Sequence, residues 1–310
     1  MTHAGKARHT YAVGEEQFFI IPVRHAGRVV SGLVILLVLF WLALEIARNP
    51  NFQFGVVGNY LVNPVVLKGV GLTLLLTVAA MTLGLVLGLI AAVSRLSPNP
   101  VFRRVSAGYI WFFRGTPVLV QLIFWFNIGI LFKNVTIGVP FTDIVFWSVP
   151  TNRLVTPLTA AILGLGLNSG AYIAEIVRAG ILSVGRGQVD AAYAIGMTAK
   201  QTMRRIILPQ AIPIAIPPLG NEFIGLLKYS ALASVIAVQE LLGSVENIYS
   251  TNFRTLELLV VASIWYLVIT SILTFGQQKL ERRYSRGRAQ IARKRSVHWF
   301  RRSSSAAIAS

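Results

Sequence analysis

The sequence contains no cysteine and only four histidines among its 310 residues. The absence of cysteine excludes disulfides, cysteine-ligated metals, iron–sulfur clusters and a thiol nucleophile. The histidines His3, His9, His25 and His298 all lie in terminal segments, which leaves an intramembrane enzyme without a histidine base or ligand. No GxxxxGK motif followed by Ser or Thr occurs, so ATP binding must belong to a partner chain. We therefore expect no catalytic residue, no cofactor and no metal site.

Acidic residues are also scarce, with 11 Asp and Glu against 29 Lys and Arg and a net charge of +18. Hydrophobic residues make up 55% of the chain, and the mean hydropathy is +0.65. Several apolar runs reach the roughly 20 residues that cross about 30 Å of hydrocarbon. This composition predicts an all-α polytopic membrane protein of one domain, because no hydrophilic stretch is long enough to bury a core of its own.

Six apolar segments predict six transmembrane helices, of which the fifth should be kinked by Pro213, Pro217 and Pro218. The predicted spans cover about residues 30–47, 70–93, 109–132, 156–177, 211–238 and 256–278. The first span follows a long polar leader and lacks a small-residue cleavage site, so we expect an anchor rather than a signal peptide.

The distribution of Lys and Arg predicts the orientation. With the N-terminus inside, 23 of these residues face the cytoplasm, five face outward and Lys228 lies in a span. Cytoplasmic loops collect such an excess, so both termini should be cytoplasmic. Five acidic residues, Glu240 among them, are then assigned to the outer side, where they balance its cations. Nearly all of the positive charge faces anionic lipid headgroups, so nucleic acid is not needed as a partner.

A polar segment within residues 178–210 interrupts the apolar chain on the cytoplasmic side. Gln188 and Asp190 suit the first turn of a short helix, and Gly196 suits a left-handed residue at its end. Thr198 and Gln201 have capping-box spacing. The segment therefore predicts two helices hinged at glycine.

The first of these helices carries a small, weakly apolar surface made by Ala191, Ala192, Ala194 and Ile195. Such a surface suits docking in a groove on a cytosolic protein. An amphipathic loop lying at the membrane interface is the alternative.

These residues also carry a family resemblance. Asp190-Ala191-Ala192, three residues, Gly196, nine residues and then Ile206-Ile207-Leu208-Pro209 resembles the EAA loop of ABC-importer permease subunits, with Asp for the usual Glu. Four further segments resemble the polar amino acid uptake subfamily of the histidine and glutamine permease type: FRGTPVLVQL (113–122), GAYIAEIVRAGI (170–181), GRGQVDAAYAIGM (185–197) and LPQAIPIAIPPLGNEFIGLLK (208–228). The resemblance covers about residues 65–280.

The resemblance implies a type I ABC-importer permease in a bacterial inner membrane. Two permease subunits, identical or paralogous, would form the pathway, and an extracytoplasmic binding protein would deliver an amino acid or a close derivative. A coupling loop, residues 185–209, would rest in a cleft of a separate cytosolic ATP-binding subunit. Its coupling residues would be Asp190, Ala191, Ala192, Gly196, Leu208 and Pro209. The sequence departs from the subfamily at 229–232, where Tyr-Ser-Ala-Leu replaces Asp-Thr-Ser-Leu.

Three parts flank this permease domain. Residues 1–29 should form a cytoplasmic segment, and residues 30–60 an additional helix with an outer loop. Residues 281–310 should form a basic, disordered cytoplasmic tail that faces membrane lipid.

Polar residues inside spans are the candidates for a substrate pathway, because charge in a membrane is costly. They are Asn168, Ser169, Tyr172, Glu175, Asn221, Glu222 and Lys228. Glu175 lies three residues from Arg178, so an intrahelical ion pair is the alternative to a gate. The segment Arg114-Gly115-Thr116-Pro117 is better explained as a bend anchored by arginine than as a substrate site.

Other functions fit less well. A secondary amino-acid carrier without an ATPase should show internal repeats and offers no reason for the helical loop. A membrane enzyme would need a nucleophile with a base, paired carboxylates or metal ligands. A sensor or scaffold would not need six spans with internal charges.

Overall fold

The computed structural model describes residues 11–13, 16–18, 26–50, 52–139 and 144–306. The chain divides into two compact units, Met1–Gln53 and Phe54–Ser310. The first unit contains a short hairpin, β1 (Tyr11–Val13) with β2 (Glu16–Phe18), and the helix α1 (Ala26–Arg48). Between Val30 and Leu42 this helix is apolar and exposes its large side chains, but this stretch is shorter than a membrane span, so the first predicted span stays a prediction.

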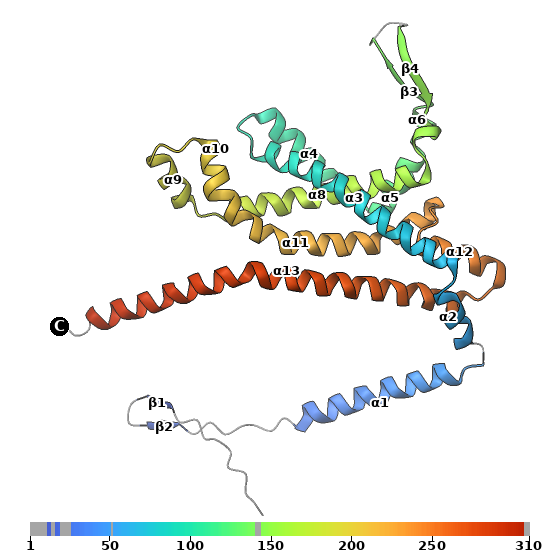
Figure 1. Ribbon diagram of the computed structural model, residues 1–310, viewed down its shortest axis with the longest axis horizontal. Helices are drawn as coiled ribbons and strands as arrows, with labels where there is room; N and C mark the ends of the chain where they lie inside the picture. Colours follow the sequence, from blue (N-terminus) through green and yellow to red (C-terminus); the bar gives the residue numbers. More distant parts are fainter. Residues whose placement is uncertain (1–10, 14–15, 19–25, 51, 140–143, 307–310) are drawn as a thin grey trace, which may run out of the picture. The chain divides into compact units, whose positions relative to one another are not determined.

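The second unit is almost entirely helical (Figure 1). Its long helices are α3 (Pro64–Leu96), α8 (Pro157–Leu182), α11 (Leu208–Tyr229) and α13 (Thr255–Ala306). The shorter helices are α2 (Phe54–Leu61), α4 (Pro100–Gly115), α5 (Val118–Phe126), α6 (Ile128–Leu131), α7 (Thr151–Leu154), α9 (Arg186–Ala194), α10 (Ala199–Thr202) and α12 (Leu241–Asn252). A π-helical turn, η1 (Met203–Ile207), a 3-10 segment, η2 (Ser230–Ile236), and the hairpin β3 (Asn134–Gly138) with β4 (Val145–Pro150) complete it.

Within the described residues, three helices are long and apolar enough to cross a membrane: α3, α8 and the Thr255–Tyr284 part of α13. Two bent helix pairs raise that number to five if each pair crosses once. The predicted fold class is confirmed for this membrane part, although neither hairpin was predicted. The count of six spans and the cytoplasmic position of both termini stay predictions.

The predicted third span, 109–132, is wrong as a single helix. α4 and α5 meet at an angle of 103°. Between them Thr116 is extended, as a residue before proline tends to be, and Pro117 cannot donate the hydrogen bond that would continue the helix. The expected bend at this segment is therefore confirmed, and it is sharper than a span with one kink.

The fifth span is followed by an unpredicted helix. α11 continues as an α-helix through Pro213, Pro217 and Pro218, and a bend of 43° separates Ile236 from α12, while the kink expected at the prolines stays a prediction. The tail differs from its prediction, since α13 continues through most of residues 281–310 and ends at Ala306. That stretch contains no proline and one glycine, so its Arg, Lys, Gln and Ala residues favour helix despite their charge.

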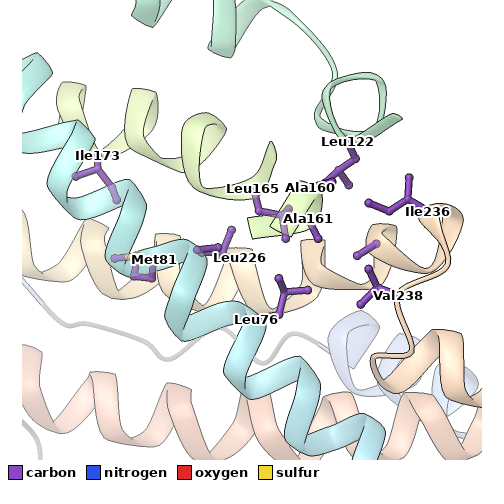
Figure 2. Packing of buried hydrophobic residues seen from close by; sticks show 12 residues of the cluster. Leu76, Met81, Leu122, Ala160, Ala161, Leu165, Ile173, Leu226, Ile236 and Val238 are labelled. Atoms are coloured by element: carbon purple, nitrogen blue, oxygen red, sulfur yellow. The ribbon is translucent and has the colours of Figure 1, made fainter. Parts of the chain in front are cut away.

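Small residues hold α3 and α8 close together. A Cβ atom on Gly88 would lie 2.6 Å from Ile173 Cγ2 and 2.8 Å from the Gly170 carbonyl oxygen. The helices begin at side-chain caps, since Asn63 accepts from Val65 N at 2.9 Å and Thr156 accepts from Thr159 N at 3.3 Å. Figure 2 shows the core between these helices and their neighbours, with Leu76, Leu122, Leu165, Leu226 and Ile236 among its buried residues.

Candidate functional site

The polar loop folds as two helices joined at glycine, as predicted. α9 ends in a Schellman motif, in which Met197 N donates to Ala192 O at 3.0 Å and Gly196 N to Tyr193 O at 2.9 Å. Gly196 has a φ of 81°, a left-handed conformation that suits glycine. The second helix begins at Thr198, whose capping box with Gln201 is complete.

One detail of the loop prediction is wrong. α9 begins at Arg186, so Asp190 is its fifth residue and does not lie in the first turn. Gln188 does lie there, and its Oε1 accepts a hydrogen bond from Gln210 Nε2 at 2.6 Å. This bond ties the first helix of the loop to the start of α11.

The loop presents an exposed surface with an apolar centre. Asp190, Ala191 and Ala194 are exposed, while Ala192 is buried. Tyr193 and Ile195, two residues apart at the end of α9, are 50% and 78% exposed and give this surface its apolar part. A surface of this kind can lie in a groove of another protein.

Leu208 and Pro209 lie where the loop passes into α11. Pro209 has no N–H group, so the Arg205 carbonyl cannot receive an α-helical bond from it, and the preceding turn is π-helical, with Leu208 N donating to Met203 O. The helical segment from Ala199 to Ile236 is nevertheless continuous. It joins the loop directly to the membrane part that carries Glu222.

Glu222 lines a cavity of about 380 Å³. The other residues of its lining are Arg114, Gly115, Thr116, Pro117, Val118, Asn168, Tyr172 and Tyr229. α8, α11 and the bend between α4 and α5 thus all contribute residues to the lining. Three of the predicted pathway residues, Asn168, Tyr172 and Glu222, therefore lie around one space.

The cavity holds both signs of charge. Ser169, which is buried, donates from Oγ to Glu222 Oε1 at 2.9 Å. Arg114 is also part of the lining, and its guanidinium lies 5.0 Å from the centre of the Tyr172 ring, a cation–π contact. A zwitterion needs both a cationic and an anionic contact, and this cavity supplies one of each.

The bend that carries Arg114 is fixed by two amides. Gln121 Nε2 donates to Thr116 Oγ1 at 2.7 Å and to Phe113 O at 3.1 Å. Asn168 Nδ2 donates to the same Phe113 carbonyl at 2.8 Å, so it joins α8 to the bend. The sequence interpretation recognised this bend but missed that its residues line the cavity.

The remaining pathway predictions lie elsewhere. Glu175 forms an ion pair with Arg178 at 2.7 Å within α8, the simpler of the two interpretations. Asn221 Oδ1 accepts from Gln277 Nε2 of α13 at 2.9 Å, away from the cavity lining. Lys228 is exposed and does not line this cavity either.

Glu240, which the charge count placed among the outer acidic residues, does not face solvent. Its side chain is fully buried at the start of α12 and accepts from Gly243 N at 2.8 Å. Tyr266 Oη of α13 donates to its Oε2 at 2.7 Å, and Thr73 Oγ1 of α3 donates at 3.2 Å. Thr73 lies within the long hydrophobic run of α3. The sequence therefore carries no sign that its hydroxyl pairs with Glu240.

Comparison with known proteins shows that the cavity and the loop lie in a region shared by one protein family. The family described as the binding-protein-dependent transport system inner membrane component matches residues 84–286. The chain belongs to this family. The matched residues include the whole loop, the bend and Glu222, so the family's shared region contains every part of the site.

Two relatives illustrate the similarity in sequence. The arginine transport system permease protein ArgU of Corynebacterium glutamicum is 43% identical over 267 residues, which cover 86% of this chain and 83% of the relative. The glutamine transport system permease protein GlnP of Escherichia coli (strain K12) is 36% identical over 221 residues, which cover 71% of this chain and 93% of GlnP.

Solved structures agree with the fold. A crystal structure of an amino acid ABC transporter with histidines matches 71% of this chain and 94% of its own, with 37% identity and a TM-score of 0.61. The MetNI methionine ABC transporter in an inward-facing conformation matches 71% of this chain and 96% of its own at 21% identity, with a TM-score of 0.55, which shows the fold alone.

Proposed function

We propose that this chain is the permease subunit of an ATP-driven importer for polar amino acids or close derivatives. Family membership makes it the inner membrane component of a binding-protein-dependent system. The names of its relatives, which transport arginine, glutamine and cystine, support an amino-acid substrate. Two such permease subunits would enclose the pathway, and residues 65–280 would form the transport domain.

The continuous helix from Ala199 to Ile236 is the observation that carries the proposal. At one end it begins within the exposed loop, and further along it carries Glu222 into the cavity. A displacement of the loop would therefore be transmitted along one helical segment to a cavity-lining carboxylate. A secondary carrier has no use for this connection.

In the proposed mechanism, the coupling loop (residues 185–209) docks on a cytosolic ATP-binding subunit. Tyr193 and Ile195 supply the apolar centre of this surface, and Asp190 supplies a charged edge. ATP hydrolysis takes place in the partner, because this chain has no phosphate-binding loop. Closure of the ATPase pair moves the loop as one unit with α11.

In the same mechanism, the amino acid enters from an extracytoplasmic binding protein and passes the cavity. Glu222, held by the Ser169 hydroxyl, faces its ammonium end, and Arg114 faces its carboxylate. Each contact replaces water that the substrate loses on entering the membrane.

Co-purification of the partners tests this assignment. Asp190→Arg and Gly196→Pro should leave membrane insertion intact and remove the ATP-binding subunit from the purified complex, since proline cannot adopt a φ of 81°. Glu246→Arg is the matched control, because it reverses a charge on α12, away from the loop. Retention of the ATPase by both loop variants at wild-type abundance, or ATP hydrolysis by this chain alone, would contradict the proposal.

A further inference from the structure

The β3–β4 hairpin carries an uncovered apolar face. Its register pairs Val135 with Val149 and Ile137 with Trp147, and directly opposite residues in an antiparallel pair share a face. The side chains of Ile137 and Trp147 are 60% and 42% exposed. On the other face Thr136 lies opposite Ser148, with their hydroxyls 3.3 Å apart, and exposed Val145 lies opposite Gly138 beyond a register shift. Around the Ile137–Trp147 and Thr136–Ser148 pairs, the hairpin therefore has one apolar and one polar face.

The position of the hairpin relative to the membrane follows from α8. The hairpin precedes the N-terminal end of this helix and the coupling loop follows its C-terminal end. A helix of 26 residues is about 39 Å long, enough to separate the two sides of the bilayer. Figure 1 shows the hairpin extending away from the helices of its unit, across the direction of α8. It thus leaves the bundle sideways, at the end opposite the coupling loop.

The base of the hairpin is fixed. Thr151, which is buried, donates from its N–H to Lys133 O at 2.9 Å and from its hydroxyl to Phe132 O. These bonds close the hairpin at the end of α6. An isolated two-stranded hairpin is only marginally stable in water. Covering the apolar face would therefore stabilise this hairpin.

The charged residues around the hairpin indicate what covers its apolar face. Neither strand contains a charged residue, while exposed Lys133 precedes β3 and exposed Arg153 follows β4. Asp143, the single acidic residue between Lys133 and Arg153 in the sequence, falls outside the described residues. The surface of a transient protein–protein interface is about as polar as the rest of a protein surface. The strands β3 and β4 are less polar than that. Trp beside apolar side chains, with Lys or Arg at the edge, is the composition of a surface lying among phospholipid headgroups.

We infer that the β3–β4 hairpin is an interfacial membrane anchor on the leaflet opposite the coupling loop. Its face of Val135, Ile137, Trp147 and Val149 enters the boundary between headgroups and acyl chains, and Lys133 and Arg153 bind headgroup phosphates. Such a contact would hold the bend and the start of α8 at a fixed depth. The inference does not depend on the transported substrate.

Spin labels can test the contact in the complete complex in phospholipid nanodiscs. This chain has no cysteine, so Ile137→Cys and the neighbouring Thr136→Cys each place one label on it, on opposite faces, once cysteines of the partner subunits are replaced. The ratio of collision with oxygen to collision with a water-soluble nickel chelate should be several-fold higher at Ile137 than at Thr136. Uptake by both labelled complexes serves as the control for folding.

Three outcomes would overturn the inference. Equal ratios at the two positions would show a hairpin in water. Protection of the Ile137 label from both reagents without binding protein would show contact with a second subunit. Protection that appears only with binding protein would show a docking surface.

The cations need a separate arm. Lys133→Gln with Arg153→Gln should lower the oxygen-to-nickel ratio at Ile137 in nanodiscs of zwitterionic phospholipid, and more strongly when anionic phospholipid is present. No change in either lipid would remove the phosphate contacts from the proposal.

Discussion

Glu222 and Glu240 are two membrane carboxylates in opposite situations. Glu240 is fully buried and accepts hydrogen bonds from α3, from α13 and from the first turn of α12. Glu222 is half-buried, accepts a single bond from Ser169 and borders a cavity. The first region is closed around its charge, and the second leaves its charge available.

The difference shows how burial separates a structural carboxylate from a functional one. Donors from three helices compensate the desolvation of Glu240, so it stabilises the position of α12 and has no capacity for a ligand. Glu222 keeps acceptor capacity that a substrate ammonium group can use. Charge within a membrane is therefore an incomplete guide to function until its hydrogen-bond partners are counted.

The largest effect is expected at Glu240. Glu240→Ala leaves Thr73, Tyr266 and the Gly243 N–H without their acceptor, and each buried donor left unpaired costs about 1–3 kcal/mol. We expect loss of most folded protein, measured as abundance in membranes and thermal unfolding in detergent. Glu240→Gln, which keeps one acceptor, should retain more. Wild-type abundance of Glu240→Ala would contradict the structural role.

Glu222→Gln should produce the opposite pattern. The amide keeps the size and the bond to Ser169 but loses the charge, so folding should be unchanged while the KM for amino-acid uptake rises about tenfold, or about 1.4 kcal/mol. Uptake kinetics in proteoliposomes at matched abundance measure this. If several amino acids are taken up with unaltered kinetics, Glu222 does not lie on the pathway.

Gly196→Ala tests the loop in a graded way. No atom lies within 4 Å of an added Cβ, so the only cost is the left-handed backbone, about 1–2 kcal/mol. We expect reduced uptake with a folded membrane domain. Gly196→Asn is the matched variant, because asparagine tolerates this conformation, and it should restore uptake. Equal defects in the two variants would indicate that conformation is not the cause.

The smallest effect is expected at the ion pair within α8. Arg178 and Glu175 are partly exposed and three residues apart, and such pairs contribute less than about 1 kcal/mol. Arg178→Gln should lower thermal stability slightly and leave uptake within about twofold. A large loss of uptake would instead support the interpretation of Glu175 as a gate residue.

The sequence predicted those parts whose signals are local. Gly196, Thr198 and Gln201 define the loop through backbone conformation and capping, which depend on neighbours along the chain. The cavity required contacts between α4, α8 and α11, so Asn168 and Glu222 could be nominated but not joined to Arg114. The burial of Glu240 was missed for the same reason, because its partners Thr73 and Tyr266 are distant along the chain.

The bent third span shows a second limit. Hydropathy identified residues 109–132 as apolar, but it does not give the direction of the helix axis. The backbone conformation around Thr116 and Pro117 turns α5 away from α4. The hairpin after it was missed because β3 and β4 lie between two apolar segments. Their Val and Ile residues favour strands, which a search for spans does not weigh.

ATP hydrolysis and amino-acid uptake, measured together in proteoliposomes of the complete complex, test the central claim most directly. The account predicts that Asp190→Arg loses both activities, because the ATPase no longer docks. It predicts that Glu222→Gln keeps ATP hydrolysis while uptake falls at limiting substrate, because only the cavity is altered. Normal uptake by Asp190→Arg, or equal loss of both activities in Glu222→Gln, would contradict a loop and a cavity joined by one helix.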